Sequence, residues 1–210
     1  TYSDRNFTEI ALDGMRKTIA SRLSEAKQTI PHFYLRRSVE MENLLDFRQK
    51  INKKLLDKNI IVSINDIVIK ACSEALQSNP NANAIWAGNK VIKFKSSDIA
   101  VAVSVEGGLF TPVIKDSDQK TISNISEEMK DLASRAKAKK LMPTEFQGGS
   151  FAISNLGMFG IESFDAIINP PHAAILAVGT GKKKPTVLDD GSLGVATKME
   201  LSLSVDHRVI

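Results

Sequence analysis

The sequence predicts an α/β protein, built as a two-layer sandwich with a mixed β-sheet. Two observations favour this class. The 210 residues have a hydrophobic content of 42%, which is enough for one large domain with a real core. Helical and strand patterns intermix along the chain without the strict strand–helix–strand alternation that a doubly wound sheet requires.

The N-terminal part begins without a regular pattern. Residues 1–12 are polar and irregular, so we expect an arm or a linker remnant there, ahead of a domain over 13–210. The first helix is expected at 14–28, where apolar residues recur at helical spacing. Asp13 can cap this helix, and Pro31 stops any continuation.

A strand and two amphipathic helices are expected next. Residues 33–39 alternate in the way a strand does. Helical spacing then covers 41–55, and it resumes at a Ser63 cap and ends before Pro80. The short piece at 59–62 between the two helices is interpreted as extended chain.

The remaining elements are mostly strands. Residues 91–94, 99–105 and 109–114 are rich in β-forming residues, and the glycines between the last two indicate a hairpin turn. A helix with Ser123 as a possible cap is expected at 122–141. Four more strands are expected at 150–154, 173–178, 186–188 and 195–205.

Composition argues against several kinds of partner. The net charge is +4, and the basic runs at 135–140 and 182–184 fit either solvated faces or attraction of a phosphate-bearing ligand. With nine Phe, two Tyr and one Trp and no aromatic-basic motif, a nucleic-acid partner is not expected. The single cysteine, Cys72, lies in an apolar helical run, which predicts an inert buried thiol and a reducing compartment.

Membrane and metal contacts are not expected either. No apolar stretch reaches the roughly 18 residues that a spanning helix needs, and the N-terminus lacks the pattern of a signal peptide. His32, His172 and His207 lie far apart, without ligand-like spacing to cysteines or carboxylates. The sequence therefore predicts neither a membrane anchor nor a metal site.

His207 is the first candidate for chemistry. Apolar and small polar residues alternate over 200–210, which places His207 at the end of an apolar row on one face of a strand. A histidine changes charge near neutral pH and can act as a general base. A core histidine satisfied by a hydrogen bond fits the same pattern, and the strand alone does not decide between the two.

Ser154 is the second candidate. It lies near the end of a glycine-bounded strand, where its hydroxyl can donate a hydrogen bond to a developing oxyanion. A turn-forming pair of Ser154 and Asn155 that satisfies its own backbone is an equal alternative. The absence of a G-x-S-x-G elbow, a Walker loop and a G-x-G-x-x-G fingerprint argues against a serine hydrolase, a P-loop nucleotide hydrolase and a Rossmann dehydrogenase.

Six short motifs, spread over the whole chain, follow one another in a characteristic order. They are MRKTIASRL at 15–23, IPHFY at 30–34, GLFTPV at 108–113, GSFAISNLG at 149–157, INPP at 168–171 and DHRVI at 206–210. Together they resemble the catalytic domains of the dihydrolipoyl acyltransferase components of 2-oxoacid dehydrogenase complexes, relatives of chloramphenicol acetyltransferase. The run SNLGMFG at 154–160 is most similar to the acetyltransferases of pyruvate dehydrogenase complexes.

The resemblance implies a chloramphenicol acetyltransferase-like fold and a specific reaction. We expect transfer of an acetyl group between the dihydrolipoyl thiol of a lipoylated domain and coenzyme A, with His207 as general base and Ser154 stabilising the tetrahedral intermediate. His32, in a motif typical of the family, either lines the channel or has a structural role. Alignment with the family places the coenzyme A contacts at Arg48, Ser63, Ser104, Met158, Phe159, Gly160, Thr180 and Lys182.

The resemblance also implies an assembly. We expect a homotrimer in which the histidine of one chain faces the serine of the next, with eight or twenty trimers forming a 24- or 60-subunit core of the pyruvate dehydrogenase complex, downstream of glycolysis. The expected partners are the lipoyl domain of the full-length protein and the 2-oxoacid decarboxylase and dihydrolipoyl dehydrogenase components. The expected location is the bacterial cytoplasm or the mitochondrial matrix. Family members continue past 206–210 with Asp-Gly and a final helix, so the domain is expected to be incomplete at its C-terminus.

Two alternatives belong to other functional classes. The chain fits a non-catalytic structural core subunit, although the presence of both His207 and Ser154 argues against that. It also fits a small-molecule O-acetyltransferase of the chloramphenicol acetyltransferase type, against which the motifs of the lipoyl family argue.

Overall fold

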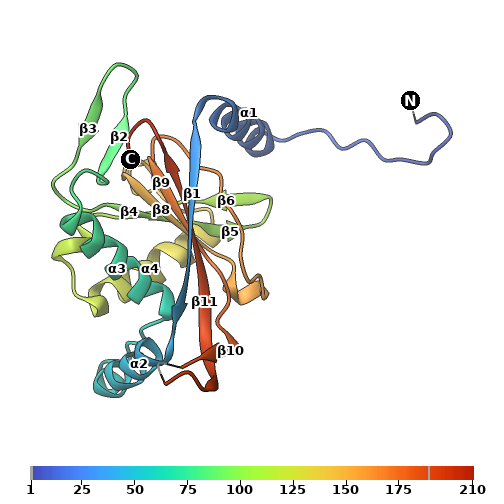
Figure 1. Cartoon of the computed structure of the whole chain (residues 1–210). Coiled ribbons are helices and arrows are strands. Elements are labelled where there is room, and N and C mark those ends of the chain that lie inside the picture. Colours follow the sequence, from blue (N-terminus) through green and yellow to red (C-terminus); the bar gives the residue numbers. More distant parts are fainter. Residues whose placement is uncertain (1, 189) are drawn as a thin grey trace.

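The computed structural model describes residues 2–188 and 190–210; Thr1, the first residue of the expected arm, lies outside them. One large mixed sheet forms the centre, and α3 (Ile64–Ser78) and α4 (Ile122–Lys137) pack together over one of its faces (Figure 1). Residues 2–13 contain no helix or strand and extend away from this body. The expected α/β architecture with a mixed sheet is confirmed.

Seven strands form the sheet, in the order β1-β11-β9-β8-β4-β7, with β10 paired to the first part of β11. The neighbours β4, β8 and β9 run parallel, and the other pairs run antiparallel. The last strand in the sequence, β11, thus lies between β1 and β9. The bounds are β1 His32–Glu40, β4 Ile99–Val101, β7 Val113–Ile114, β8 Phe151–Asn155, β9 Ala174–Val178, β10 Lys182–Val187 and β11 Leu193–Asp206.

The other elements surround the sheet. The helices α1 (Gly14–Thr29) and α2 (Glu42–Lys54) lie towards opposite ends of β1, at the top and at the bottom of Figure 1. Two small hairpins lie outside the main sheet, and single 3₁₀ turns connect other segments. The hairpins pair β2 (Ala84–Trp86) with β3 (Val91–Lys93) and β5 (Val103–Val105) with β6 (Gly108–Phe110), and the turns are η1 Leu56–Lys58, η2 Ser117–Gln119, η3 Pro143–Glu145 and η4 Gly157–Phe159.

Two helix starts follow from local hydrogen bonding, as the sequence predicts. The Asp13 carboxylate accepts a hydrogen bond from the backbone N–H of Arg16 at 2.7 Å, which satisfies one free donor at the start of α1. Ser63 and Asp66 form a reciprocal capping box at the start of α3, with hydrogen bonds of 3.1 and 2.8 Å. Both predicted caps are confirmed.

The predicted cap and end of the fourth helix are wrong. Thr121, rather than Ser123, caps α4, because its hydroxyl accepts from the N–H of Asn124 at 3.2 Å. The helix ends at Lys137 instead of residue 141, because Lys139 has a left-handed backbone with φ of 56° that breaks the helix.

The long strands predicted at 99–105 and 109–114 are each divided. The N–H of Ala102 donates to Ile153 at 2.8 Å, and beyond it the chain leaves the main sheet to form the β5–β6 hairpin. Pro112 lacks an N–H and separates β6 from β7. The strand predicted at 186–188 begins earlier, because the lysine run at 182–184 is part of β10, and the three-residue β2 was not predicted.

Apolar side chains fill both faces of the sheet. On one face, residues of α3 and α4 such as Ile69 and Ile125 pack against Ile99 and Ile153 of the central strands. On the other face, a smaller cluster includes Ile168, from the segment that follows η4. The second cluster holds that segment against the sheet, next to His32.

Gly179, directly after β9, allows a close approach of two backbones. A Cβ atom at this position would lie 1.8 Å from the carbonyl oxygen of Glu162, whereas a Cβ at Gly181 would meet only a Thr197 methyl group at an ordinary 3.6 Å. We expect Gly179→Ala to destabilise the fold by about 3 kcal/mol through overpacking, which corresponds to a fall in Tm of about 6–12 °C for a domain of this size. Calorimetry checks this, with Gly181→Ala as the matched control and an expected change below about 2 °C.

Cys72 lies on α3 and packs against the main core. Burial raises the pKa of the Cys72 thiol to about 12, because an apolar surrounding disfavours the thiolate. Cys72 is half-buried, so we expect slow alkylation of this thiol in the folded protein at pH 8 and rapid alkylation in guanidinium chloride, both followed by mass spectrometry. Equally rapid labelling of the native protein would contradict the burial.

No helix within 2–188 and 190–210 has both the length and the apolar content that crossing a bilayer requires. The same residues contain no group of three or more His, Cys, Asp and Glu side chains placed to hold a metal ion.

Candidate active site

His207 lies in a turn directly after β11, at the end of the sheet where β1 begins. Its backbone N–H donates to the carbonyl oxygen of Pro31 at 3.1 Å, so the turn is held to the start of β1. The side chain is exposed and stacks on the ring of Phe33, with 5.0 Å between the ring centroids and an angle of 18°. The predicted apolar row is present, but His207 projects from its end instead of being buried in the core.

The hydrogen bonds of His207 define which ring nitrogen is available. Nδ1 lies 2.7 Å from the carbonyl oxygen of Ile210, which can only accept, so Nδ1 carries the proton. Nε2 has no hydrogen-bond partner within the part of the chain that the structure describes. An exposed imidazole with a fixed tautomer and a free Nε2 lone pair is suited to take a proton from a substrate.

Ser154 lies at the opposite end of the sheet, near the end of β8. It is half-buried, and the amide of its neighbour Asn155 accepts from the N–H of Gly157 at 2.9 Å and lies 3.4 Å from the amide of Asn65. The local turn is therefore satisfied by Asn155. The Ser154 hydroxyl is therefore not needed to hold the turn. This differs from the alternative considered for the sequence, in which Ser154 and Asn155 together satisfy the backbone of the turn.

Five of the predicted coenzyme A contacts gather around this end. Met158, Phe159 and Gly160 form the turn η4 and its cap, immediately after β8. The N–H of Thr180 donates to Ile161 at 2.8 Å, so the residue after Gly179 lies against the same turn. Lys182 begins β10 and lies 2.5 Å from Glu162.

The other three predicted contacts lie on other elements near the same end. The guanidinium Nε of Arg48 donates to the carbonyl oxygen of Val62 at 2.9 Å, next to Ser63 at the start of α3. Ser104 lies on β5, just beyond the point where β4 pairs with Ile153. All eight predicted contacts therefore lie on the Ser154 side of the sheet.

Lys182 is not a free cation in the chain. Its ammonium pairs with Glu162, and Lys184 lies 3.8 Å from the same carboxylate. The hydrogen bond from Lys182 lowers the pKa of Glu162 below its usual range, with a further contribution from the charges of both lysines. A phosphate at this position would have to compete with Glu162.

The sheet register separates His207 from Ser154 within one chain. Ser154 pairs with Ala177 of β9, and Ala177 pairs with Ser202 of β11, which is five residues before His207. Five residues of extended strand span about 16 Å, and two strand spacings add about 10 Å across the sheet. The two side chains cannot meet on one acyl group in a single copy of the chain.

The other two histidines have structural roles in this fold. His32 uses both ring nitrogens on the backbone, since Nδ1 lies 2.9 Å from the Ile30 carbonyl oxygen and Nε2 accepts from the N–H of Ile168 at 3.1 Å. His172 is buried and contacts the Gly148 carbonyl oxygen at 3.0 Å through Nε2. Burial lowers the pKa of His172, because desolvation disfavours the charged ring. Of the two roles considered for His32, the contacts favour the structural one.

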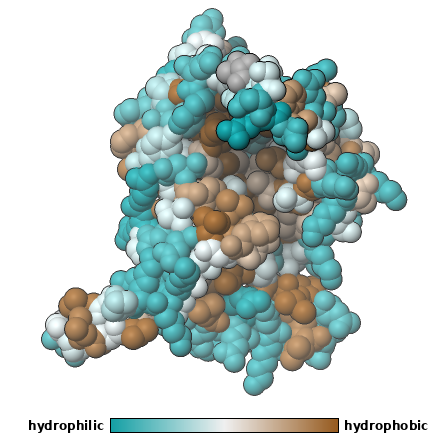
Figure 2. Space-filling view, turned by 90° about the vertical axis from the view of Figure 1, so that its right-hand side faces the viewer, coloured by the Kyte–Doolittle hydropathy of each residue, from teal (hydrophilic) through white to brown (hydrophobic). Residues whose placement is uncertain are grey.

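Exposed apolar side chains border both candidate residues. Phe33 and Leu35 on β1 are 43% and 50% exposed, and Met158 and Phe159 of η4 are 77% and 64% exposed. The face that carries the β5–β6 hairpin has apolar side chains gathered in its hollowed middle part (Figure 2). Apolar surface on this scale is typical of a face that another molecule covers.

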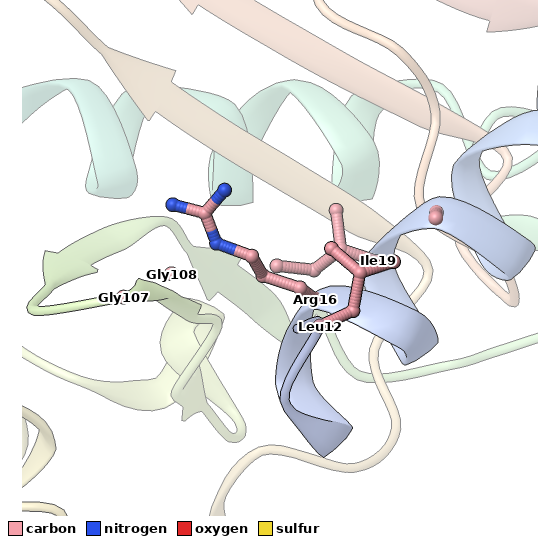
Figure 3. Close-up of a pocket in the computed structure, with 6 residues that line it drawn as sticks. Leu12, Arg16, Ile19, Gly107 and Gly108 are labelled. Carbon is pink, nitrogen blue, oxygen red and sulfur yellow. The ribbon is translucent and has the colours of Figure 1, made fainter. Parts of the chain in front are cut away.

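A hollow of about 590 Å³ opens between α1 and the β5–β6 turn. Leu12, Arg16 and Ile19 line one side, and the Arg16 side chain points across towards Gly107 and Gly108 (Figure 3). The hairpin opposite α1 is the one that carries Ser104. The hollow thus borders the hairpin that carries one of the coenzyme A contacts expected from the family resemblance.

Two residues near His207 were missed in the sequence. The sequence pattern predicts Phe33 only as the first residue of a strand, although its ring stacks on His207. Trp86, from the unpredicted strand β2, lies under the guanidinium of Arg208 at 5.0 Å from its ring centroid. The single Trp of the chain was a usable signal, because a lone Trp in a polar segment such as 79–90 needs a packing partner.

The chain is similar to characterised proteins over the whole region that carries the six motifs. Residues 4–210 match the family model described as 2-oxoacid dehydrogenases acyltransferase (catalytic domain). The chain is 49% identical to the dihydrolipoyllysine-residue acetyltransferase component of the pyruvate dehydrogenase complex from Zymomonas mobilis, covering 99% of this chain and 47% of that protein. For the mitochondrial counterpart from Dictyostelium discoideum the identity is 43%, covering 99% of this chain and 33% of that protein. The chain thus spans about half the length, or less, of these relatives.

Solved structures agree in fold. A structure of the Azotobacter vinelandii dihydrolipoamide acetyltransferase, studied for the role of a serine, a histidine and an asparagine in its catalytic mechanism, superposes with a TM-score of 0.93 at 31% identity, covering 98% of this chain and 85% of that one. The cubic core of a pyruvate dehydrogenase multienzyme complex gives a TM-score of 0.92, also at 31% identity and with the same coverage. Chloramphenicol acetyltransferase, at 11% identity and a TM-score of 0.57, shares the fold alone; it covers 90% of this chain and 86% of that one.

The motif order, the mixed sheet with its helical layer and the match over 4–210 lead to one assignment. This chain belongs to the 2-oxoacid dehydrogenase acyltransferase family, in its catalytic domain.

Proposed function

We propose that this chain is the catalytic domain of a dihydrolipoyllysine-residue acetyltransferase, which moves an acetyl group between a dihydrolipoyl thiol and coenzyme A in the core of a pyruvate dehydrogenase complex. The observation that carries the proposal is His207, exposed at the end of β11 with its Nδ1 proton bound and its Nε2 free. The relatives that are 49% identical to this chain, over 47% of their own length, carry this activity in their names, which supports the choice of acetyl group.

The proposed step is an exchange of a thiol for a thioester. Nε2 of His207 takes the proton from the thiol of coenzyme A, and the thiolate attacks the carbonyl carbon of the acetyl-dihydrolipoyl thioester. The Ser154 hydroxyl donates a hydrogen bond to the oxyanion that forms. When the intermediate collapses, the dihydrolipoyl sulfur leaves and takes back the proton from Nε2, so the enzyme returns to its starting state.

The site proposed for this step is shared between two copies of the chain. The separation of about 16 Å along the sheet between His207 and Ser154 supports an arrangement in which the histidine of one copy faces the serine of the next. The exposed Phe33 beside His207 and the exposed Met158 beside Ser154 provide apolar surface for that contact. A homotrimer satisfies this head-to-tail arrangement, because each copy then contributes both halves of a site.

The remaining partners follow from the reaction. Coenzyme A is the co-substrate, held by residues on the Ser154 side, and the lipoyl group is supplied by a separate domain. Assembly of trimers into a 24- or 60-subunit core, with a 2-oxoacid decarboxylase and dihydrolipoyl dehydrogenase as partners, completes the proposal, in a bacterial cytoplasm or a mitochondrial matrix. The relation to a cubic core of known structure supports the assembly.

One assay tests the function directly. The purified protein is mixed with acetyl-coenzyme A and either dihydrolipoamide or a small alcohol such as chloramphenicol, and the release of free coenzyme A and formation of the acetylated product are followed. Transfer to dihydrolipoamide alone supports the proposal. Transfer to the alcohol alone would assign the chain to the chloramphenicol acetyltransferase class, and transfer to neither, by an assembled protein, would leave a structural core subunit.

A further inference from the structure

The turn that carries His207 is held by its two neighbours in the sequence. Asp206 is only 2% exposed, and its carboxylate accepts hydrogen bonds from Nε and Nη2 of Arg208 at 2.9 and 2.7 Å. The backbone N–H groups of Val209 and Ile210 donate to the Asp206 carbonyl oxygen, at 2.9 and 3.1 Å. His207 therefore sits inside a loop that the Asp206–Arg208 pair closes.

The Arg208 guanidinium has a second contact outside this loop. Its Cζ atom lies 5.0 Å from the ring centroid of Trp86, within the range of a cation–π interaction. Trp86 ends β2, on the hairpin that stands apart from the main sheet. Arg208 is thus fixed on one side by a buried carboxylate and on the other by an aromatic face.

The hairpin that presents Trp86 is itself anchored. The side chain of Asn83, which is 1% exposed, donates to the carbonyl oxygens of Phe94 and Ser96 at 3.1 and 2.9 Å and accepts from the Ser150 hydroxyl. Ser150 directly precedes β8, so the base of the hairpin is joined to the main sheet. The strand that presents Trp86 is therefore tied to the main sheet at its base.

A buried carboxylate such as that of Asp206 depends on its charged partner, because a lone charge at that depth is strongly disfavoured. Without the aromatic face, the guanidinium of Arg208, whose side chain is 30% exposed, is free to exchange its position over Trp86 for water. The loop would then be less well defined, and a displacement of a catalytic group by about 1 Å can cost about 100-fold in rate.

We propose that Trp86 is a positioning residue for His207, acting through Arg208 and Asp206. The proposal rests on the proposed role of His207 as the general base. The role of Trp86 is indirect, through its contact with Arg208. It fixes the guanidinium that closes the loop, and the loop sets where Nε2 points.

Two substitutions at one position test this. Trp86→Leu removes the aromatic face and keeps an apolar side chain, whereas Trp86→Phe keeps a smaller aromatic face. We expect Trp86→Leu to lower kcat about 10-fold with the KM values for coenzyme A and dihydrolipoamide within about 2-fold of the unmodified protein, and Trp86→Phe to recover kcat to within about 3-fold. Ile92→Ala, on the same hairpin and opposite Ile85, is the matched control and should leave kcat within about 2-fold.

The outcomes separate this proposal from the proposed function. If His207→Gln is inactive and Trp86→Leu has the kcat of the unmodified protein, the positioning role alone fails. An equal loss in Trp86→Phe and Trp86→Leu, an equal loss in Ile92→Ala, or a loss that appears in KM also overturns it. If His207→Gln keeps full activity, the proposed function fails first, and the role of Trp86 fails with it.

Discussion

Replacing His207 with Gln is expected to lower kcat for acetyl transfer by about 1,000-fold, within the range found for loss of a general base. Gln keeps a polar side chain of similar length but cannot accept the thiol proton. For a free thiol and a free imidazole, reference pKa values of about 8.5 and 6.5 make the transfer uphill by about 2.7 kcal/mol, so the base must be well placed to be useful. The measurement is the initial rate with acetyl-coenzyme A and dihydrolipoamide at saturating concentrations.

His172→Gln serves as the comparison for this substitution. The side chain of His172 is buried, lies within hydrogen-bond distance of the Gly148 carbonyl oxygen, and has no part in the proposed step. We expect it to lower Tm but to leave kcat of the folded protein within about 3-fold. A His207→Gln protein that retains more than a tenth of the original kcat would remove His207 from the role of base.

The second large effect is expected at Ser154. Loss of one oxyanion donor typically costs about 100- to 1,000-fold in kcat, so Ser154→Ala should fall in this range. Because the hydrogen bond strengthens only as the oxyanion forms, the KM for coenzyme A should stay within about 2-fold. Steady-state kinetics with both substrates varied separates the two parameters.

Ser104→Ala is the matched control for Ser154→Ala. Ser104 is an exposed serine on the same side of the sheet and was assigned only to coenzyme A binding. It should change KM for coenzyme A and leave kcat within about 2-fold. If Ser154→Ala has the same kcat as the unmodified protein, Ser154 is not the donor to the oxyanion.

The two inactive variants together test whether the site is shared. When His207→Gln and Ser154→Ala chains are co-expressed in equal amounts, random mixing in a closed head-to-tail ring gives about one quarter of the sites an intact histidine and an intact serine. Activity should therefore return to about a quarter of the original value. If each chain had a complete site of its own, the mixed assembly would stay inactive.

Short-range features of this fold could be predicted from the sequence. The caps Asp13 and Ser63 act on backbone groups three residues away, so the residues that decide them stand next to one another in the sequence. The cap at Thr121 differs from the predicted Ser123 because either side chain can cap a helix, and only the backbone geometry selects between them. The division of 99–105 could not be predicted, because it depends on the pairing of Ala102 with Ile153.

The sequence predicts which residues belong to the candidate site, but it does not predict how these residues are arranged in space. The motifs identify His207 and Ser154, but their separation follows from the register of three strands that are distant in the sequence. The role of His32 depends on Ile168, which is 136 residues away, and the position of Arg208 depends on Trp86 from an unpredicted strand. Contacts between residues that are distant in the sequence produce no periodic pattern from which a single sequence could predict them.

The position of β11 between β1 and β9 has a consequence for the order of folding. Its pairing with β1 joins His32 to Asp206 and so closes a loop that contains nearly the whole domain. Contacts so distant in sequence form slowly, because the chain entropy lost in closing the loop must be overcome before the pairing stabilises it. Until β11 enters between β1 and β9, both of those strands expose unpaired edges that can bind other chains. The base and its turn are therefore expected to become ordered late in folding, after the helices and the parallel strands, when the sheet closes.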